Sequence, residues 1–527
     1  MTRGAAVRYG AAVRYGAGVG ASVDPKLDDS GIPDTAWVAA HPDRYGLEFP
    51  AAGAAEGPPE RRGVRLAGVA LDEIAQGAGT PTYVYDAEGI RQRLARVRAA
   101  LGPGRGGVPD PLVCYAVKAN SALAVLRVLA CEGAGADIVS GGELQRALEA
   151  GIVPQRIVFS GVGKTDAEID AAIAAGIRSI NVESAEELHR VMARADAANR
   201  SVPVSLRLNP DVDPVTHPYL ATGLRKSKFG IPMVQAADLA MRAHGHPNVR
   251  LVGLACHIGS QIVDAAPYRE SVMHLRRTIG ALRGAGVTLS QLDLGGGMGV
   301  AYRPGEPEID ISAWGRALRI ETDELGLQLV VEPGRWLVAE CGVLLTRVIG
   351  RKRGEGSAFV IVDAAMNDLL RPALYEAYHP IVPVRRVEPH ESLTIVDVVG
   401  PVCESGDFLA LGRALPTVEA GDLMMVLDAG AYGMVMASTY NTRALPAEVI
   451  VDGGRWAITR PRRSIEALLG DEAIPPWLRL AARGRGRAAH WAHAGVTCST
   501  PPLRTSCGAV TTVMSRSGSP STTTMSA

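Results

Sequence analysis

The sequence LVCYAVKANS, residues 112–121, places a lone lysine directly after an apolar segment. The apolar part, residues 112–117, predicts a buried β-strand, and Lys118 then opens a polar loop. A lysine amine in this position can form an imine with an aldehyde cofactor if partial desolvation lowers its pKa. Solvated lysines at strand ends are far more common, so this segment alone does not identify a site.

Seven similar apolar segments follow along the chain. The eight predicted strands are residues 112–117, 136–140, 157–160, 179–182, 204–208, 251–256, 291–294 and 328–331. Amphipathic helical patterns lie between them, at residues 143–150, 167–175, 185–198, 268–283 and 311–325. Eight strand–helix units predict a TIM-type (β/α)8 barrel. An open doubly wound sheet is the alternative, although that fold usually has fewer strands and a phosphate-binding loop after the first.

The residues that follow the predicted strands are reactive or phosphate-binding types. They are Lys118, Asp137 with Ser140, Ser160 with Gly161, Glu183, Asn209, His257 with Ser260, Gly295 to Gly297, and Glu332 to Arg335. Each of them alone is typical of a turn or a helix cap. Because functional side chains in TIM barrels lie at the carboxyl ends of the strands, the whole set predicts one polar mouth.

The alternation of strand-like and helix-like segments is replaced by other patterns on both sides of the barrel. Short β-rich segments with few helical patterns begin near residue 346, and PTYVY, residues 81–85, is a further strand that we expect to pair with them. The expected division is a poorly ordered N-terminal extension (1–65), a lead-in (66–111), the barrel (112–345), a C-terminal β-sandwich or β-barrel domain (346–482) and a low-complexity tail (483–527).

Composition excludes several classes of function. The chain has 55 Lys and Arg and 55 Asp and Glu, which argues against nucleic acid or an anionic membrane as the main partner. The seven cysteines form no CxxC pair, and their odd number excludes complete internal disulfide pairing. With no signal-type segment at the N-terminus, this predicts a cytoplasmic protein, and the spacing predicts no metal site.

The residues at the predicted mouth suit pyridoxal phosphate. Lys118 would take its aldehyde, and the backbone of Gly295 to Gly297, with Ser260, would approach its phosphate without a Cβ in the way. Glu332 would pair with the pyridine nitrogen, and His257 could stack on the ring. GVGKT (161–165) and GGGMG (295–299) each lack a glycine that a P-loop or a dinucleotide fingerprint requires.

Longer motifs carry a family resemblance over about residues 80–465. They are YAVKANS (115–121), GADIVSGGEL (135–144), FSGVGKT (159–165), LNPDVD (208–213), HPYLATGLRKSKFGI (217–231), CHIGSQ (256–261), LDLGGGMG (292–299), EPGR (332–335), MNDLLRPALYEAYH (366–379), GPVCESGDFLA (400–410) and GAYG (430–433). The chain resembles the diaminopimelate decarboxylases, which are fold-type III pyridoxal-phosphate enzymes with an alanine-racemase-like barrel.

This resemblance implies roles for particular residues. Lys118 would be the Schiff-base lysine, His257 would stack on the cofactor, and Cys403 would be a proton donor. The expected cofactor-binding residues are Lys118, Asp137, His257, Ser260, Gly295, Gly296, Gly297, Glu332, Gly334, Arg335 and Tyr432; the expected substrate-binding residues are Arg335, Arg371, Tyr375, Glu404 and Tyr432. The resemblance also implies a homodimer in which Cys403 and Glu404 reach the site of the other chain.

The implied reaction is the decarboxylation of meso-2,6-diaminopimelate to L-lysine and CO2, the last step of lysine biosynthesis. A carboxylate at the ring nitrogen, Glu332, favours decarboxylation over racemisation, and Arg335 with Arg371 suits substrate carboxylates. Three alternatives stay open: a basic amino-acid decarboxylase for ornithine or arginine, a barrel that only carries pyridoxal phosphate, and a regulatory partner-binding protein.

Overall fold

The computed structural model describes residues 32–50, 63–212 and 228–478. Met1–Asp471 forms one compact unit, and Glu472–Ala527 forms a second, of which the described part holds only the short 3-10 helix Pro476–Leu478. The whole of the predicted tail, residues 483–527, and the first 31 residues lie outside the described residues, as does most of the motif at 217–231.

A closed parallel barrel forms where the sequence predicts it. Its strands are β5 (Leu112–Ala116), β6 (Gly135–Ile138), β7 (Ile157–Phe159), β8 (Ser179–Val182), β9 (Val202–Asn209), β11 (Val249–Ala255), β12 (Gln291–Asp293) and β13 (Gln328–Val331). Neighbours pair in this order, β13 pairs with β5, and β8 pairs with β9, so the ring has no open edge. Nearly every strand residue is buried, which is why the strands read as short apolar runs. The TIM-type prediction is confirmed, and the open-sheet alternative is wrong.

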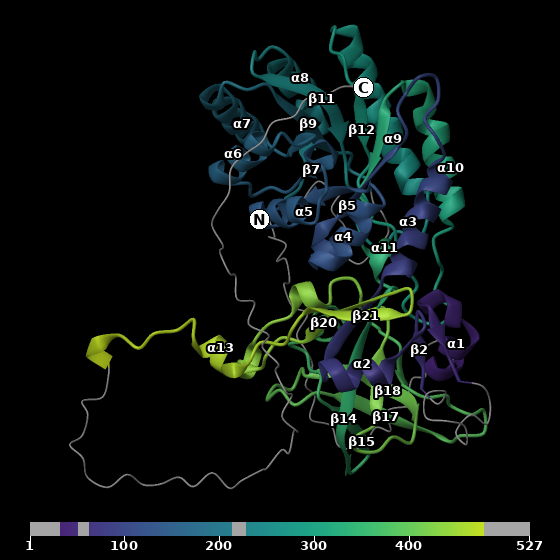
Figure 1. Cartoon of the computed structure of the whole chain (residues 1–527). Helices are drawn as coiled ribbons and strands as arrows, with labels where there is room; N and C mark the ends of the chain where they lie inside the picture. Colours follow the sequence, from purple (N-terminus) through teal and green to yellow (C-terminus); the bar gives the residue numbers. More distant parts are fainter. Residues whose placement is uncertain (1–31, 51–62, 213–227, 479–527) are drawn as a thin grey trace, which may run out of the picture. The chain divides into compact units, whose positions relative to one another are not determined.

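Helices surround this barrel. They are α4 (Leu123–Cys131), α5 (Gly141–Glu149), α6 (Asp166–Ala175), α7 (Ala185–Ala198), α8 (Ala236–His244), α9 (Ala266–Gly284) and α10 (Ile311–Thr322). Figure 1 shows α6, α7 and α8 outside β7, β9 and β11. All five predicted helices are present. The two that were not predicted are α8 and α4, whose sequence LAVLRVLAC is apolar around most of its circumference and so lacks an amphipathic pattern.

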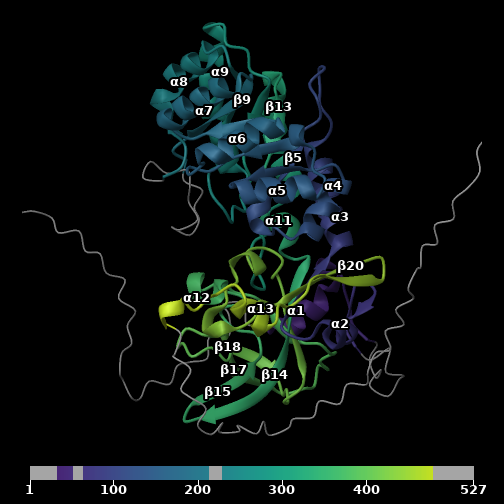
Figure 2. The ribbon, with the colours of Figure 1, turned by 60° about the vertical axis from the view of Figure 1, so that its left-hand side comes forward.

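The β-rich part forms a second sheet of nine strands. These are β4 (Thr82–Asp86), β14 (Gly342–Gly354), β15 (Ser357–Val362), β16 (Ile381–Pro383), β17 (Leu393–Val399), β18 (Phe408–Pro416), β19 (Leu423–Val426), β20 (Ala447–Asp452) and β21 (Arg455–Arg460). Figure 2 shows β14, β15, β17 and β18 together. As expected, β4 joins this sheet, between β14 and β20.

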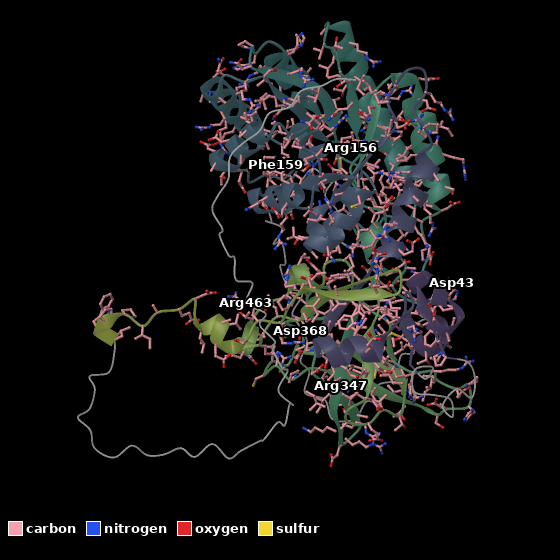
Figure 3. All side chains as sticks on the ribbon, in the orientation of Figure 1. Asp43, Arg156, Phe159, Arg347, Asp368 and Arg463 are labelled. Atoms are coloured by element: carbon pink, nitrogen blue, oxygen red, sulfur yellow. The ribbon has the colours of Figure 1, made fainter. Side chains whose placement is uncertain are left out.

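Side-chain contacts fasten β4 further into this part. Tyr83 donates a 2.7 Å hydrogen bond to the backbone oxygen of Asp368, which is labelled in Figure 3. Strand β14 begins at Gly342, slightly before the expected domain boundary at 346, and the boundaries themselves stay a prediction. None of the described helices combines the length and apolarity that a membrane span requires.

The expectation of a poorly ordered extension over residues 1–65 is wrong for residues 32–50. This stretch contains α1 (Asp34–Ala40) and the short strand β1 (Leu47–Glu48). Asp34 is buried and accepts hydrogen bonds from Arg413 at 2.6 Å and from the backbone N–H of Ile381 at 2.9 Å. A single carboxylate anchors the segment through partners hundreds of residues away, and no local sequence pattern signals such an anchor.

Candidate active site

A cavity of about 990 Å³ lies at the carboxyl ends of the barrel strands and reaches the β-rich part. Ten of the predicted site residues line it: Lys118, His257, Ser260, Gly297, Glu332, Gly334, Arg335, Arg371, Tyr375 and Tyr432. They come from loops after four barrel strands and from segments beyond residue 370. Closure of the barrel therefore brings together groups that are far apart in the sequence.

Lys118 follows β5 in a single 3-10 turn, Val117–Ala119. Its side chain is 37% exposed, and its Nζ atom lies 3.5 Å from Oδ2 of Asp137, which is buried behind the cavity lining. Burial acts to lower the pKa of Lys118, but the charges of Asp137 and Glu332 outweigh it and raise the pKa above its ordinary value. The condition that desolvation lower the pKa of the lysine is therefore not met in this structure, because Asp137, Tyr432 and Glu332 act in the opposite direction.

Glu332 lies in a cluster of buried polar groups directly after β13. Its carboxyl group contacts that of Asp293, and Ser160 donates a 3.4 Å hydrogen bond to its Oε1 atom. Burial, and then the nearby carboxylates Asp137 and Asp293, raise the pKa of Glu332 well above its ordinary value. The carboxyl group of Glu332 thus lies buried beside the cavity, where a ring nitrogen could share a proton with it.

The three glycines after β12 allow neighbouring loops to meet. A Cβ on Gly296 would lie 2.0 Å from the backbone oxygen of Glu332, and one on Gly297 would lie 2.3 Å from that of Gly259. Gly295 and Gly297 also have φ angles of +66° and +100°, which side chains disfavour. Glycine is thus required for the loops after β11, β12 and β13 to converge.

Fewer backbone N–H groups of the three glycines are available to a phosphate than the sequence predicted. The N–H of Gly295 donates to Asp293 at 2.9 Å, and that of Gly296 donates to Nδ1 of His257 at 3.1 Å. Of the three glycines, only Gly297 lines the cavity. The prediction that all three bind phosphate is not supported by this geometry, because two of the N–H groups are used to hold Asp293 and His257.

His257 is oriented by the same contact. Burial, and then the positive charges of Lys118 and Arg207, lower the pKa of His257 well below its ordinary value. The ring is therefore neutral, and since Nδ1 accepts the Gly296 N–H, the hydrogen resides on Nε2. A neutral, fixed imidazole in the cavity wall suits stacking against an aromatic ring.

Two buried guanidinium groups define one side of the cavity. Arg335 donates to Ser260 Oγ at 3.1 Å, and its Cζ atom lies 4.8 Å from the ring centre of Tyr432. Arg335 and Arg371 both donate to the hydroxyl of Tyr302, at 2.7 and 2.6 Å. Within the part of the chain that the structure describes, neither arginine makes an ion pair with a carboxylate. Two unpaired buried cations favour an anionic ligand.

Cys403 and Glu404 do not join this cavity within one chain. Both side chains are exposed, and neither residue is among those that line it. The backbone N–H of Cys403 donates to Asn441 at 3.0 Å, which holds the loop to its own β-rich part. Their proposed action on the site of a second chain stays a prediction.

Sequence reasoning missed Tyr302 and Arg207, which also line the cavity. Arg207 forms a 2.8 Å ion pair with Glu183 and lies over the ring of Phe229. It was detectable as the single cation in the apolar strand VPVSLRLN, 202–209. Tyr302 lies in an irregular loop, where the sequence offers no signal.

The comparisons with known proteins agree with this site. The family model described as "Pyridoxal-dependent decarboxylase, pyridoxal binding domain" matches residues 88–339. The chain is 48% identical to the diaminopimelate decarboxylase of Pseudomonas aeruginosa over 410 residues. This aligned region covers 78% of this chain and 96% of that relative. The chain belongs to the diaminopimelate decarboxylase family.

Other members of the diaminopimelate decarboxylase family match over a similar length. The relative from Zymomonas mobilis is 45% identical over 412 residues, again 78% of this chain and 96% of that protein. The crystal structure of diaminopimelate decarboxylase from Helicobacter pylori, complexed with L-lysine, gives a TM-score of 0.72 at 40% identity. It covers 76% of this chain and 98% of that chain.

Pyridoxal phosphate is the cofactor that this family membership assigns, and the residues present fit it. Lys118 offers an amine that opens onto the cavity, and Glu332 offers a buried carboxyl group for a ring nitrogen. Oδ1 of Asp137, beside the lysine, is buried without a hydrogen-bond partner among the described residues. Gly297 and Gly334 line the cavity without side chains, which leaves room for close approach of a ligand.

Proposed function

We propose that this protein decarboxylates meso-2,6-diaminopimelate to L-lysine and CO2 with pyridoxal phosphate, the last step of lysine biosynthesis. The observation that carries the proposal is the pair of buried guanidiniums, Arg335 and Arg371, which face the cavity without a carboxylate partner among the described residues. Ornithine and arginine, the substrates of the alternative enzymes, have no distal carboxylate that could pair with these two guanidinium groups. Leaving two buried cations unpaired would cost several kcal/mol, about 2–5 for one broken buried pair.

The residues have distinct roles in this proposal. Lys118 binds the cofactor aldehyde, Glu332 binds the ring nitrogen and keeps a proton there, and His257 packs on the ring face. When bound, pyridoxal phosphate withdraws the electrons that the departing CO2 leaves on the substrate carbon. Arg335, Arg371 and Tyr375 hold the distal carboxylate.

The remaining roles concern the phosphate. Ser260, Tyr432, Gly297 and Gly334 bind this group, and all four line the cavity, whereas Gly295 and Gly296 support the loop from behind. Asp137 acts from behind Lys118 by keeping the amine charged until the cofactor binds.

We further propose a cytoplasmic homodimer. In it, Cys403 of one chain supplies a proton to the site of the other, and Glu404 contacts the distal ammonium of the substrate. This is supported by the exposure of both side chains and by their absence from the cavity lining of their own chain. A two-fold dimer would complete both sites with the same pair of contacts.

The test is CO2 release by the purified holoenzyme from meso-diaminopimelate, ornithine and arginine at equal concentrations. We expect kcat/KM for diaminopimelate to exceed the others by about 30-fold or more, because only this substrate pairs with both guanidiniums. Equal or better turnover of ornithine or arginine would overturn the proposal in favour of the basic amino-acid alternative.

A further inference from the structure

Tyr302 lies between the two arginines that face the cavity. Its hydroxyl oxygen accepts a hydrogen bond from Nη1 of Arg335 at 2.7 Å and another from Nη1 of Arg371 at 2.6 Å. The Cζ atom of Arg371 also lies 4.5 Å from the centre of the Tyr302 ring. One phenol oxygen thus fixes the distance between two like charges that would otherwise repel each other.

The valence of this oxygen limits what else it can do. A phenol has two acceptor positions and one hydrogen to donate, and guanidinium groups only donate. Both acceptor positions of Tyr302 are therefore occupied by the arginines. Among the described residues no acceptor receives its hydroxyl hydrogen, although Tyr302 itself lines the cavity. That hydrogen is available to a ligand that lies beside both arginines.

The rest of the side chain is held firmly. Tyr302 is only 6% exposed, and its ring packs edge-on against His379, with centroids 5.4 Å apart. Burial, and then the charge of Arg371, lower the pKa of His379 well below its ordinary value, so this neighbour is neutral and does not compete for the anion. The hydroxyl is thus set at a defined point rather than on a mobile side chain.

We propose that Tyr302 is a specificity residue, which holds Arg335 and Arg371 as a fork and donates its hydroxyl hydrogen as a third contact to the distal carboxylate of the substrate. The inference rests on the proposed function, because it names a further contact within the same site. A ligand without that carboxylate leaves the hydroxyl and both guanidiniums unsatisfied, whereas a carboxylate satisfies all three.

The test compares binding of L-lysine, which has a carboxylate, and cadaverine, which lacks one, to the holoenzyme and to its Tyr302→Phe variant. The variant keeps the ring against His379 and loses one oxygen. We expect lysine affinity to fall about 10- to 100-fold, the range for a lost hydrogen bond to a charged group, and cadaverine affinity to change less than about twofold. KM for diaminopimelate should rise more than kcat falls, and the cofactor absorbance should not change.

Tyr378→Phe is the matched control. Tyr378 also lines the cavity, but its hydroxyl donates to Asp34 at 2.5 Å, whereas the hydroxyl oxygen of Tyr302 accepts from both arginines. The ratio of lysine to cadaverine affinity should therefore match that of the wild type. In the Tyr302→Phe, Arg371→Lys double variant, the loss of lysine affinity should be smaller than the product of the single losses, because both changes disrupt one network.

The outcomes separate this inference from the proposed function. Unchanged lysine affinity in Tyr302→Phe, or equal losses for lysine and cadaverine, would overturn the role of Tyr302 even if the wild type decarboxylates diaminopimelate. A wild type that prefers lysine to cadaverine but releases no CO2 from diaminopimelate would overturn the proposed reaction alone. A wild type that neither prefers lysine to cadaverine nor releases CO2 from diaminopimelate would overturn both.

Discussion

The Nζ atom of Lys118 lies 3.5 Å from Oδ2 of Asp137, at the ends of two adjacent barrel strands. This neighbour and Glu332 overcome the effect of burial and raise the pKa of the lysine. The amine is therefore a cation in the free protein and must lose a proton before it can bond to an aldehyde. The buried Asp137 carboxylate accepts the hydrogen bond that this amine donates.

Replacing Lys118 with alanine should remove the covalent link to the cofactor and nearly all turnover. Lys118 is one of two described lysines that line the cavity; the other, Lys228, is an exposed residue beside the ring of Phe229. Borohydride reduction followed by mass spectrometry reads the adduct directly. Lys228→Ala is the matched control and should keep the adduct. An active Lys118→Ala protein with the adduct at another residue would show that the assignment is wrong.

Glu332→Gln should still bind pyridoxal phosphate but lose most activity. The neutral amide cannot keep a proton on the ring nitrogen, and one lost ionic stabilisation is worth about 3 kcal/mol, or on the order of 10²-fold in kcat. Steady-state kinetics and cofactor absorbance separate the two effects.

Glu306→Gln is the control for this change. Glu306 also lines the cavity, but it accepts hydrogen bonds from the backbone N–H groups of Tyr302 and Arg303, and glutamine can still accept them. Its kcat should stay within about twofold of the wild type. If Glu332→Gln is equally active, the charge of the ring nitrogen is set by another group.

Arg371→Ala should weaken diaminopimelate binding far more than cofactor binding. It removes one of the two buried guanidiniums, and we expect KM to rise by about 30-fold or more. Arg303→Ala is the comparison, since Arg303 lines the same cavity but lies over the ring of Tyr378. A KM near that of the wild type in Arg371→Ala would remove this residue from the substrate site.

Mixing inactive Lys118→Ala with inactive Cys403→Ala should restore activity through subunit exchange. In a two-fold dimer with shared sites, each mixed dimer has one intact site and one doubly altered site. Random exchange makes about half of the dimers mixed, so roughly a quarter of wild-type activity should return. Mixed dimers that form without any activity would mean that each site is built from a single chain.

Asp428→Asn should change how stability depends on pH. The Asp428 carboxyl is fully buried, and neither oxygen has a hydrogen-bond partner among the described residues. Burial raises its pKa from 3.8 to about 7, despite the opposing charge of Arg44. Because the folded form holds its proton more tightly, wild-type stability should fall as pH rises from about 4 to about 7, by on the order of 4 kcal/mol from this group alone.

The asparagine variant lacks this ionisation. The difference in thermal unfolding midpoint between the variant and the wild type should therefore grow in favour of the variant between pH 4 and pH 7 and then level off. Parallel curves for the two proteins across this range would show that Asp428 does not titrate there.

Local patterns in the sequence were sufficient to predict the barrel. Its strands are short apolar runs because both faces are buried, and its helices α5 and α7 are amphipathic because one face meets those strands. Once the order of strands is known, the topology requires that Lys118 and Glu332 share a mouth. Local sequence patterns therefore predicted both the barrel fold and the presence of Lys118 and Glu332 in one cavity.

Only the tertiary structure decided how the charges are paired. The anchoring of Asp34 by Arg413 and the shared contact of Arg335 and Arg371 with Tyr302 join residues far apart in the chain. The same holds for the raised pKa of Lys118, since desolvation and neighbouring carboxylates act in opposite directions and their balance depends on distance. The sequence alone determined which groups are present; closure of the barrel and packing of the second sheet determined which of them face one another.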